Sequence, residues 1–214
     1  MSIVDVVKQR FTSKAYDASR KLSEEQQQQI LDILRYSPSS LNLQPWHFVA
    51  VTSDEGKEKI LPAIRDFNAA KVRDAAMVVV FASKDTLDDA QFSRVQQQEL
   101  QDGRFKDEAS ATANDNGRRG YIAAYGGSEQ DLRTWMERQT YISLGFLLLG
   151  AAEMGLHATP IEGIDPEKLD DVLSLKQQGL HSLSVVAIGY NSEKDFNASL
   201  PKSRLAEELV ITRL

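Results

Sequence analysis

Three short segments of this chain are dense in side chains that suit an anion: two combine cations with hydroxyl groups, and one is rich in hydroxyl and amide groups. They are Arg10–Lys14 (RFTSK), Ser37–Trp46 (SPSSLNLQPW) and Leu200–Arg204 (LPKSR). Arginine binds phosphate through paired hydrogen bonds, and lysine acts as a point charge. In a chain with a formal net charge of −6, such clusters indicate a locally built phosphate pocket. Each segment alone is more typical of a solvated turn, because charged residues are mostly exposed.

Several common catalytic chemistries have no motif here. The sequence contains no GxGxxG, GxxxxGK[ST], HExxH or GxSxG pattern. The absence of cysteine excludes disulfides, thiolate metal sites and a cysteine nucleophile. The three histidines, His47, His157 and His181, have no metal-ligand spacing, so no metal site is predicted. We expect a structural role for His47, which begins a strand.

The elements that must position these segments follow from β-branched runs and helical spacing. Helices are predicted after Ser23, which begins a capping-box pattern, and across Ser53–Lys71. The polar stretch Gln91–Asp131 contains several glycines and predicts short helices and loops outside the core. Strands are predicted at His47–Ser53, Met77–Ser83, Ser182–Tyr190 and, more briefly, Leu209–Thr212. Together they indicate a mixed α+β architecture.

Arg133–Met154 is the strongest predicted helix, with Gly155 as a natural C-cap. From Ile142 to Ala152 it is apolar on all faces, which indicates burial in a core or between subunits. Gly145 and Gly150 each cost about 1 kcal/mol relative to Ala within a helix. We therefore expect both glycines to pack closely against another backbone.

Length and composition are those of one globular domain spanning residues 1–214. The N-terminus does not have the pattern of a signal peptide, and the longest apolar run is too short to span a bilayer. The negative net charge disfavours nucleic-acid binding. The sequence therefore predicts a soluble, cytoplasmic protein with neither membrane nor nucleic-acid partners.

The three segments occur together with FNAAK and PIEGI in the order and spacing of the nitroreductase family. The chain resembles the oxygen-insensitive NAD(P)H nitroreductases, also called dihydropteridine reductases, and the bacterial flavin reductases. The resemblance covers essentially the full length and is weakest at Gln91–Asp131, apart from ANDNGRR. It implies a nitroreductase-like α+β fold with a mostly antiparallel sheet flanked by helices. It also implies a homodimer that holds two FMN molecules at its interface and exchanges its C-terminal strand, with Arg133–Met154 as the central dimer helix.

The resemblance also implies which side chains hold FMN. Arg10, Lys202 and Arg204 match phosphate-binding cations, and Thr12 matches a ribityl or phosphate hydroxyl position beside Phe11. Lys14 and Lys71 match lysines at the pyrimidine end of the ring, and Asn68 matches an amide at the ring edge. Pro38, Ser39, Ser40 and Asn42 match partner-subunit contacts. Pro160, Ile161, Glu162 and Gly163 match the strip over the ring face, where the backbone amide of Glu162 approaches flavin N5.

The implied activity is two-electron ping-pong reduction of nitroaromatics and quinones by NADH or NADPH through flavin N5. Lys14 and Lys71 suit this chemistry because positive charge stabilises the negative charge that reduction leaves on the ring. Glu162 is the third candidate catalytic residue, able to orient a ligand or water. Phe11, Leu41 and Gly120 depart from the closest relatives, and Leu41, Phe67 and Tyr121 are the candidate substrate contacts.

Other functions remain open at this stage. The physiological acceptor is alternatively a free flavin or a dihydropteridine. A non-catalytic flavin-binding dimer, or a structural dimer without cofactor, is a more distant alternative. The sequence does not determine the preference between NADH and NADPH.

Overall fold

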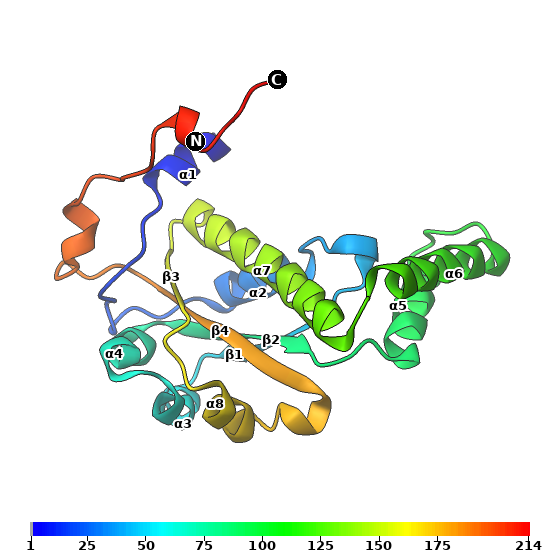
Figure 1. The fold of residues 1–214 in the computed structure, drawn as a ribbon. Helices are drawn as coiled ribbons and strands as arrows, with labels where there is room; N and C mark the ends of the chain where they lie inside the picture. Colours follow the sequence, from blue (N-terminus) through cyan, green and yellow to red (C-terminus); the bar gives the residue numbers. More distant parts are fainter. Residues whose placement is uncertain (1) are drawn as a thin grey trace.

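The centre of the chain is a four-stranded sheet in the computed structural model, which describes residues 2–214 (Figure 1). All neighbouring strands are antiparallel. Three of the predicted strands are confirmed to within two residues at each end. The short third strand contains Pro160, which weakened its pattern in the sequence. In the spatial order β1-β2-β4-β3, the strands are β1 (Trp46–Val51), β2 (Met77–Lys84), β4 (Leu180–Gly189) and β3 (His157–Ile161).

The helices lie on both faces and at one end of this sheet. The predicted capping box at Ser23 is confirmed, because its hydroxyl and the Gln26 side chain each accept from the other residue's backbone N–H. Pro62 lies in a short 3₁₀ turn that divides the predicted helical stretch Ser53–Lys71 into two helices. The helices are α1 (Ile3–Gln9), α2 (Glu24–Arg35), α3 (Asp54–Ile60), α4 (Asp66–Asp74), α5 (Asp89–Gln101), α6 (Glu108–Tyr125), α7 (Glu129–Glu153) and α8 (Pro166–Leu173).

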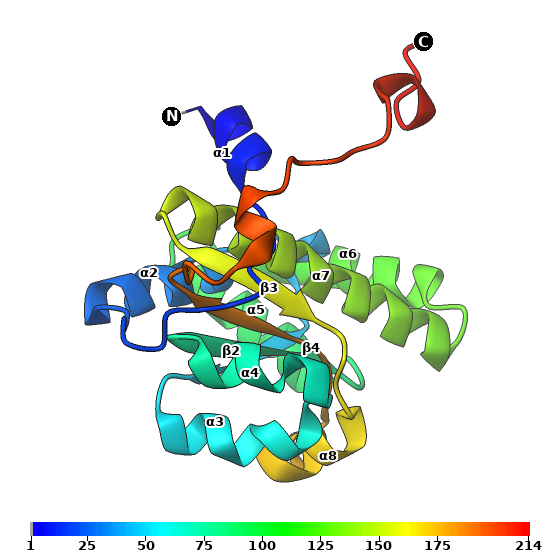
Figure 2. The ribbon, with the colours of Figure 1, turned by 90° about the vertical axis from the view of Figure 1, so that its left-hand side faces the viewer.

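Alternation along the central strands produces two hydrophobic cores. Successive side chains of a strand point to opposite faces. Val78 and Val80 of β2 therefore join the core beneath α3, α4 and α8, whereas Val79 and Phe81 join the core beneath α2 and α7. Figures 1 and 2 show these two layers of helices on either side of the sheet.

The expectation of short helices and loops across Gln91–Asp131 is wrong. Two long helices, α5 and α6, occupy most of this stretch and project to one side of the sheet (Figure 1). Aspartates Asp88 and Asp107 cap their N-termini. Gly120 lies within α6, where a Cβ would meet nothing within 4 Å, so this glycine does not interrupt the helix.

Helix α7 begins four residues before the predicted start, because the hydroxyl of Ser128 caps it by accepting from Asp131 N. One side of the helix packs into the core, with Leu147 fully buried. The opposite side leaves Ile142 and Phe146 40% and 47% exposed. The expected all-round burial is therefore not achieved within one chain, and burial between subunits is the remaining alternative.

The glycines of α7 differ from each other in their surroundings. A Cβ at Gly150 would lie 2.5 Å from the Ile33 side chain, so this glycine does allow close packing. Its neighbour is a side chain, however, and the expected contact with another backbone is wrong. A Cβ at Gly145 would meet nothing within 4 Å in this chain. The predicted C-cap is confirmed, because Gly155 has a φ of +72°.

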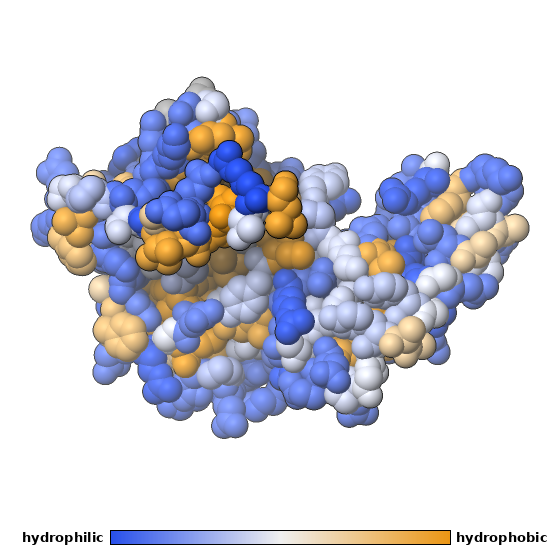
Figure 3. Space-filling model, turned by 45° about the horizontal axis from the view of Figure 1, so that its top comes forward, coloured by the Kyte–Doolittle hydropathy of each residue, from blue (hydrophilic) through white to orange (hydrophobic). Residues whose placement is uncertain are grey.

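Residues 200–214 are exposed along their whole length. The strand expected at Leu209–Thr212 is absent from this chain. A 3₁₀ turn ends at Leu209, and the residues after it have no regular structure. A strand needs a neighbour for its hydrogen bonds, and nothing within residues 2–214 supplies one here. Both termini lie on the same side of the molecule, and Figure 3 shows apolar residues gathered on that side.

No helix within residues 2–214 is long and apolar enough to cross a membrane. Over the same range, no group of three or more His, Asp or Glu residues is arranged to hold a metal ion.

Candidate active site

Three cations from opposite ends of the chain meet beside α1. The Lys202 ammonium donates to the backbone carbonyl of Arg10. Burial and the neighbouring Arg204 lower the pKa of Arg10, and burial together with both arginines lowers the pKa of Lys202. No carboxylate within residues 2–214 contributes to either shift. The structure therefore brings together the three predicted phosphate cations, with their mutual repulsion uncompensated.

A second group of cations, Lys14 and Lys71, lies at helix α4, which contains Lys71. The Lys71 ammonium donates to Asn68 Oδ1 at 2.8 Å and to the Phe67 carbonyl at 2.9 Å. Burial, and then the charge of Lys14, lowers the pKa of Lys71. Asn68 is only 7% exposed. The three residues predicted at the ring edge, Lys14, Asn68 and Lys71, thus lie together. The side-chain NH₂ group of Asn68 remains available to bind a ligand.

The strip predicted to cover the flavin ring, residues 160–163, begins in β3 and continues past its end. It is called the Gly163 strip below. Pro160 and Ile161 complete the strand, and Glu162 and Gly163 follow it. The Gly163 carbonyl accepts from Arg65 N at 3.0 Å. A Cβ at Gly163 would lie 2.5 Å from Asn68 Nδ2, so only glycine fits between this strip and α4.

Asp195 holds the RFTSK segment in place, and the sequence analysis did not identify it. Its Oδ2 accepts from the Ser13 hydroxyl at 2.9 Å and from Lys14 N at 2.8 Å. Two residues later, the Asn197 amide donates to the Thr12 carbonyl at 2.7 Å. Asp195 lies five residues before the LPKSR segment, but nothing in the sequence shows that its side chain is buried, with 5% exposure.

Tyr141 is a second residue that the sequence analysis missed. It projects from the exposed side of α7, and its hydroxyl donates to Glu162 Oε1 at 2.7 Å. Burial, followed by the hydrogen bond to Glu162, raises the pKa of Tyr141 to about 12. The phenol therefore stays protonated at neutral pH and fixes the carboxylate of the candidate catalytic Glu162.

Phe11 lies on the other side of the cation cluster. Its ring centroid is 5.1 Å from that of His157, and both rings line a pocket of about 530 Å³ with Arg10. Burial is the main cause of a lowered pKa at His157. The charge of Arg20 lowers this pKa further, whereas the charge of Asp195 raises it.

The predicted partner-subunit contacts form a separate group on loop 38–44. Ser40 N donates to Gln139 Oε1 of α7 at 2.9 Å. Gln139 and Tyr141 are two residues apart, so they lie on nearly opposite sides of the helix. No hydrogen bond or ion pair within residues 2–214 joins this loop to the RFTSK segment or to α4. The predicted site residues of one chain therefore fall into two groups on different sides of α7, and each group is called a half-site below.

Loop 38–44 has an unusual backbone. Leu41, Asn42 and Gln44 have φ values of 58°, 53° and 45°. This left-handed conformation costs roughly 1–2 kcal/mol for each residue that is not glycine. Beside the loop is a pocket of about 670 Å³, whose lining includes Pro38, Ser39 and Leu41.

The three candidate substrate contacts are divided between the half-sites. Phe67 is 75% exposed and lies near Gly163, where a Cβ would be 3.1 Å from its ring. Leu41 belongs to loop 38–44. Tyr121 projects from α6, is 47% exposed and stacks on Tyr125 with ring centroids 5.9 Å apart.

Comparison with known proteins identifies the family. The family model described as "Nitroreductase family" matches residues 7–190. The chain is 46% identical over 217 residues to the oxygen-insensitive NAD(P)H nitroreductase of Salmonella typhimurium, covering all of both chains. It is 33% identical to the major NAD(P)H-flavin oxidoreductase of Aliivibrio fischeri, covering 99% of this chain and 98% of the relative. The chain belongs to the nitroreductase family.

Solved structures confirm the nitroreductase-like α+β fold. A protein from Exiguobacterium sibiricum, solved in complex with FMN, has a TM-score of 0.84 at 21% identity and covers 100% of this chain and 98% of its own. The nitroreductase family protein of Streptococcus pneumoniae has a TM-score of 0.80 at 19% identity, with full coverage of both chains. At these identities the likeness shows the fold alone.

Proposed function

We propose that this nitroreductase-family protein is an FMN-dependent NAD(P)H oxidoreductase that reduces nitroaromatics and quinones by two electrons. The observation that carries the proposal is the placement of five cations, Arg10, Lys14, Lys71, Lys202 and Arg204. Arg10, Lys202 and Arg204 lie together beside α1, Lys14 lies close to Lys71 of α4, and none of the five forms an ion pair within residues 2–214. The names of the relatives from Salmonella typhimurium and Aliivibrio fischeri support the same class of reaction.

The residues present fit FMN in charge and in shape. Arg10, Lys202 and Arg204 form an uncompensated cluster that suits a phosphate, which accepts charge-assisted hydrogen bonds. Lys14 and Lys71 form a second positive pair for an electron-rich ring edge. Gly163 lets the strip approach α4 closely, because a Cβ there would lie 2.5 Å from Asn68 Nδ2 and 3.1 Å from the Phe67 ring.

When bound, FMN supplies the redox chemistry by taking a hydride from NADH or NADPH and passing it to the acceptor. Lys14 and Lys71 stabilise negative charge at the pyrimidine end of the ring. Asn68 presents its NH₂ group, because its oxygen already accepts from Lys71. Tyr141 fixes the Glu162 side chain through a 2.7 Å hydrogen bond, so Glu162 orients donor or acceptor at the ring face.

A second copy of the chain completes the site in this proposal. The exposed side of α7 carries Ile142 and Phe146, and a partner backbone has room to approach at Gly145. Packing two chains along this face brings loop 38–44 of one copy toward the Gly163 strip of the other. The exposed C-terminal segment then has a neighbour with which Leu209–Thr212 can form the exchanged strand.

The physiological acceptor has a second candidate. A relative with 33% identity is named for NAD(P)H-flavin oxidoreduction, which favours free flavin as an alternative substrate of the same site. Dihydropteridine is a further acceptor of this kind. Relative kcat/KM values for a nitroaromatic, a quinone, free FMN and a dihydropteridine discriminate these substrates.

The proposal is tested by the visible spectrum of the purified protein and its anaerobic response to NADH and then NADPH. We expect a yellow protein that bleaches on addition of the nucleotide and recovers its colour when a nitroaromatic or quinone is added. The nucleotide that bleaches it faster is the preferred donor. A yellow protein that does not bleach would indicate flavin binding without catalysis. A colourless protein that takes up no added FMN would overturn the cofactor assignment.

A further inference from the structure

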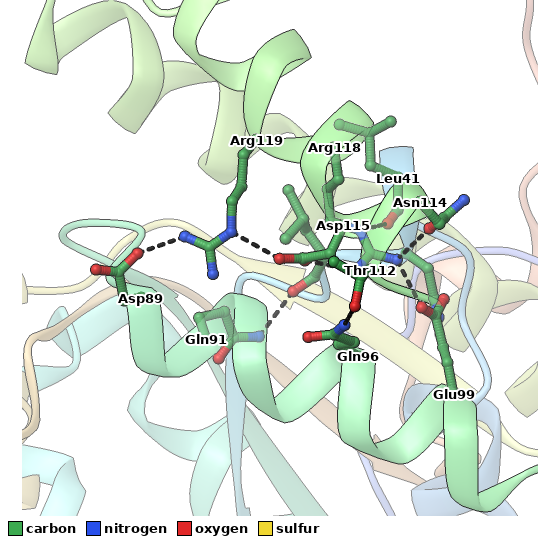
Figure 4. Close-up of polar contacts among 12 residues, drawn as sticks. Leu41, Asp89, Gln91, Gln96, Glu99, Thr112, Asn114, Asp115, Arg118 and Arg119 are labelled. Atoms are coloured by element: carbon green, nitrogen blue, oxygen red, sulfur yellow. Dashed lines mark hydrogen bonds and ion pairs between the residues drawn. The ribbon is translucent and has the colours of Figure 1, made fainter. Parts of the chain in front are cut away.

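Buried charges from α5 and α6 hold loop 38–44 (Figure 4). Arg118 Nε donates to the Leu41 carbonyl at 3.0 Å, and its Nη2 donates to Glu99 Oε2 at 2.7 Å. The other Glu99 oxygen accepts from the Asn42 side-chain amide at 3.0 Å. Two opposite charges that neutralise each other therefore hold two consecutive loop residues.

These two charges are buried and are held by neighbouring protein groups. Arg118 is 3% exposed and Glu99 is 4% exposed. The remaining Arg118 donors contact Asp115 at 3.3 Å and Asn114 at 3.2 Å. Four of the five N–H donors of Arg118 are thus engaged by protein groups, although the residue lines the pocket beside the loop. Its role is to hold protein groups in position.

The loop residues that this pair holds are two of the three with a left-handed backbone. Leu41 and Asn42 have φ values of 58° and 53°. Such conformations persist only when the surroundings over-determine them. Gln91 of α5 adds a third contact by donating to the Leu43 carbonyl at 2.7 Å. Without these partners, an extended or right-handed backbone is the lower-energy state.

We propose that Arg118 and Glu99 are positioning residues that keep Leu41 and Asn42 in the conformation needed to contact FMN and the electron acceptor. This inference rests on the proposed function, because it assigns loop 38–44 to that site. It makes helices α5 and α6 a part of the active site, although neither Arg118 nor Glu99 itself contacts a ligand. Both residues come from the stretch Gln91–Asp131, Glu99 from the part where the family resemblance is weakest and Arg118 from its ANDNGRR segment.

Arg119 provides a matched control. It is the neighbouring arginine on α6, and it pairs with the same Asp115 through a 2.6 Å hydrogen bond. Its other partner is Asp89 at the surface. It makes no hydrogen bond to loop 38–44 within the described residues. A substitution here disturbs the same network and leaves the loop contacts in place.

The experiment compares Arg118→Lys with Arg119→Lys in the purified holoenzyme. Lysine keeps the charge, but it cannot bind the Leu41 carbonyl and Glu99 through one rigid planar group. We expect Arg118→Lys to raise KM for the acceptor and the rate of FMN release on dilution by on the order of tenfold, with kcat within about twofold. Arg119→Lys is expected to leave KM, kcat and FMN release within about twofold of wild type.

A thermal melt separates positioning from a merely structural role. A lower Tm for Arg118→Lys with unchanged KM and FMN release would overturn the inference. If Arg118→Lys does not fold, Glu99→Gln decides, because glutamine preserves the shape of the side chain and removes the charge opposite Arg118. Unchanged KM and FMN release in Glu99→Gln would refute the positioning role of this pair. If the wild-type protein neither retains nor takes up FMN, the proposed function fails instead, which is a distinguishable result.

Discussion

Cations without carboxylate partners define the candidate site at the scale of single residues. Elsewhere in the chain, buried cations are neutralised, as Arg118 is by Glu99 and Lys57 is by Asp54. Around Arg10 and Lys71, by contrast, the neighbouring charges are themselves positive and lower both pKa values further. Such an arrangement is unfavourable in isolation and becomes favourable when an anion binds.

Replacing two of these cations tests the phosphate assignment. We expect Lys202→Ala with Arg204→Ala to weaken FMN binding by about 100-fold or more, because two charge-assisted hydrogen bonds are lost. The measurement is the flavin content of the purified variant, followed by titration of the apoprotein with FMN. Lys168→Ala with Lys176→Ala removes two exposed lysines that pair with aspartates, and it serves as the control. A double variant at 202 and 204 that retains its full flavin content would refute the assignment.

At the scale of elements, the turn after β3 and the first part of α4 form one unit. An isolated bridge joins Ile64 to Ile164, and the Gly163 carbonyl accepts from Arg65 N. These contacts place the Gly163 strip against Asn68. The position tolerates no side chain, because a Cβ would overlap the amide at 2.5 Å.

Alanine substitutions at two glycines should therefore have opposite effects. We expect Gly163→Ala to displace Asn68, weaken FMN binding by on the order of tenfold and destabilise the fold by about 1–3 kcal/mol. Gly120→Ala should stabilise α6 by about 0.5–1 kcal/mol, because the site is open and alanine is the better helix former. Urea unfolding with and without added FMN measures both effects. Equal FMN affinity in Gly163→Ala and wild type would contradict the predicted close approach.

At the scale of the whole molecule, the two half-sites do not meet within one chain. The first half-site includes Lys14 and the Gly163 strip, whereas loop 38–44 lies on the other side of α7. The face between them is apolar and exposed at Ile142 and Phe146. A dimer across this face accounts for both observations.

Placing charges on this face tests the dimer. We expect Ile142→Glu with Phe146→Glu to yield monomers that lose FMN, because buried unpaired carboxylates oppose association and the half-sites separate. Sedimentation or light scattering gives the mass, and absorbance gives the flavin content. Lys168→Glu introduces a carboxylate at an exposed lysine of α8, on the opposite face of the sheet from α7, and should remain dimeric. A double variant that remains a dimer with bound flavin would rule out this interface.

Local sequence patterns were sufficient for much of the fold. β-Branched runs located β1, β2 and β4, and the capping box located α2. These local patterns failed where contacts between residues far apart in the chain decide the structure. Glycines and polar residues suggested loops at Gln91–Asp131, but tertiary packing and capping aspartates support α5 and α6. Leu209–Thr212 has strand-like residues but no neighbouring strand in this chain.

The sequence by itself determined the chemistry of the candidate site, because a cation or an amide carries its hydrogen-bonding capacity wherever it lies. It also located the segments RFTSK, FNAAK, PIEGI and NASLPKSR. Only the tertiary structure decided which of them meet and what holds them, since these contacts join residues far apart in the chain. The bonds from Ser13 to Asp195, Tyr141 to Glu162 and Arg118 to Leu41 span 182, 21 and 77 positions. Burial strengthens the bond between Ser13 and Asp195, and burial is a property of the fold rather than of any one residue.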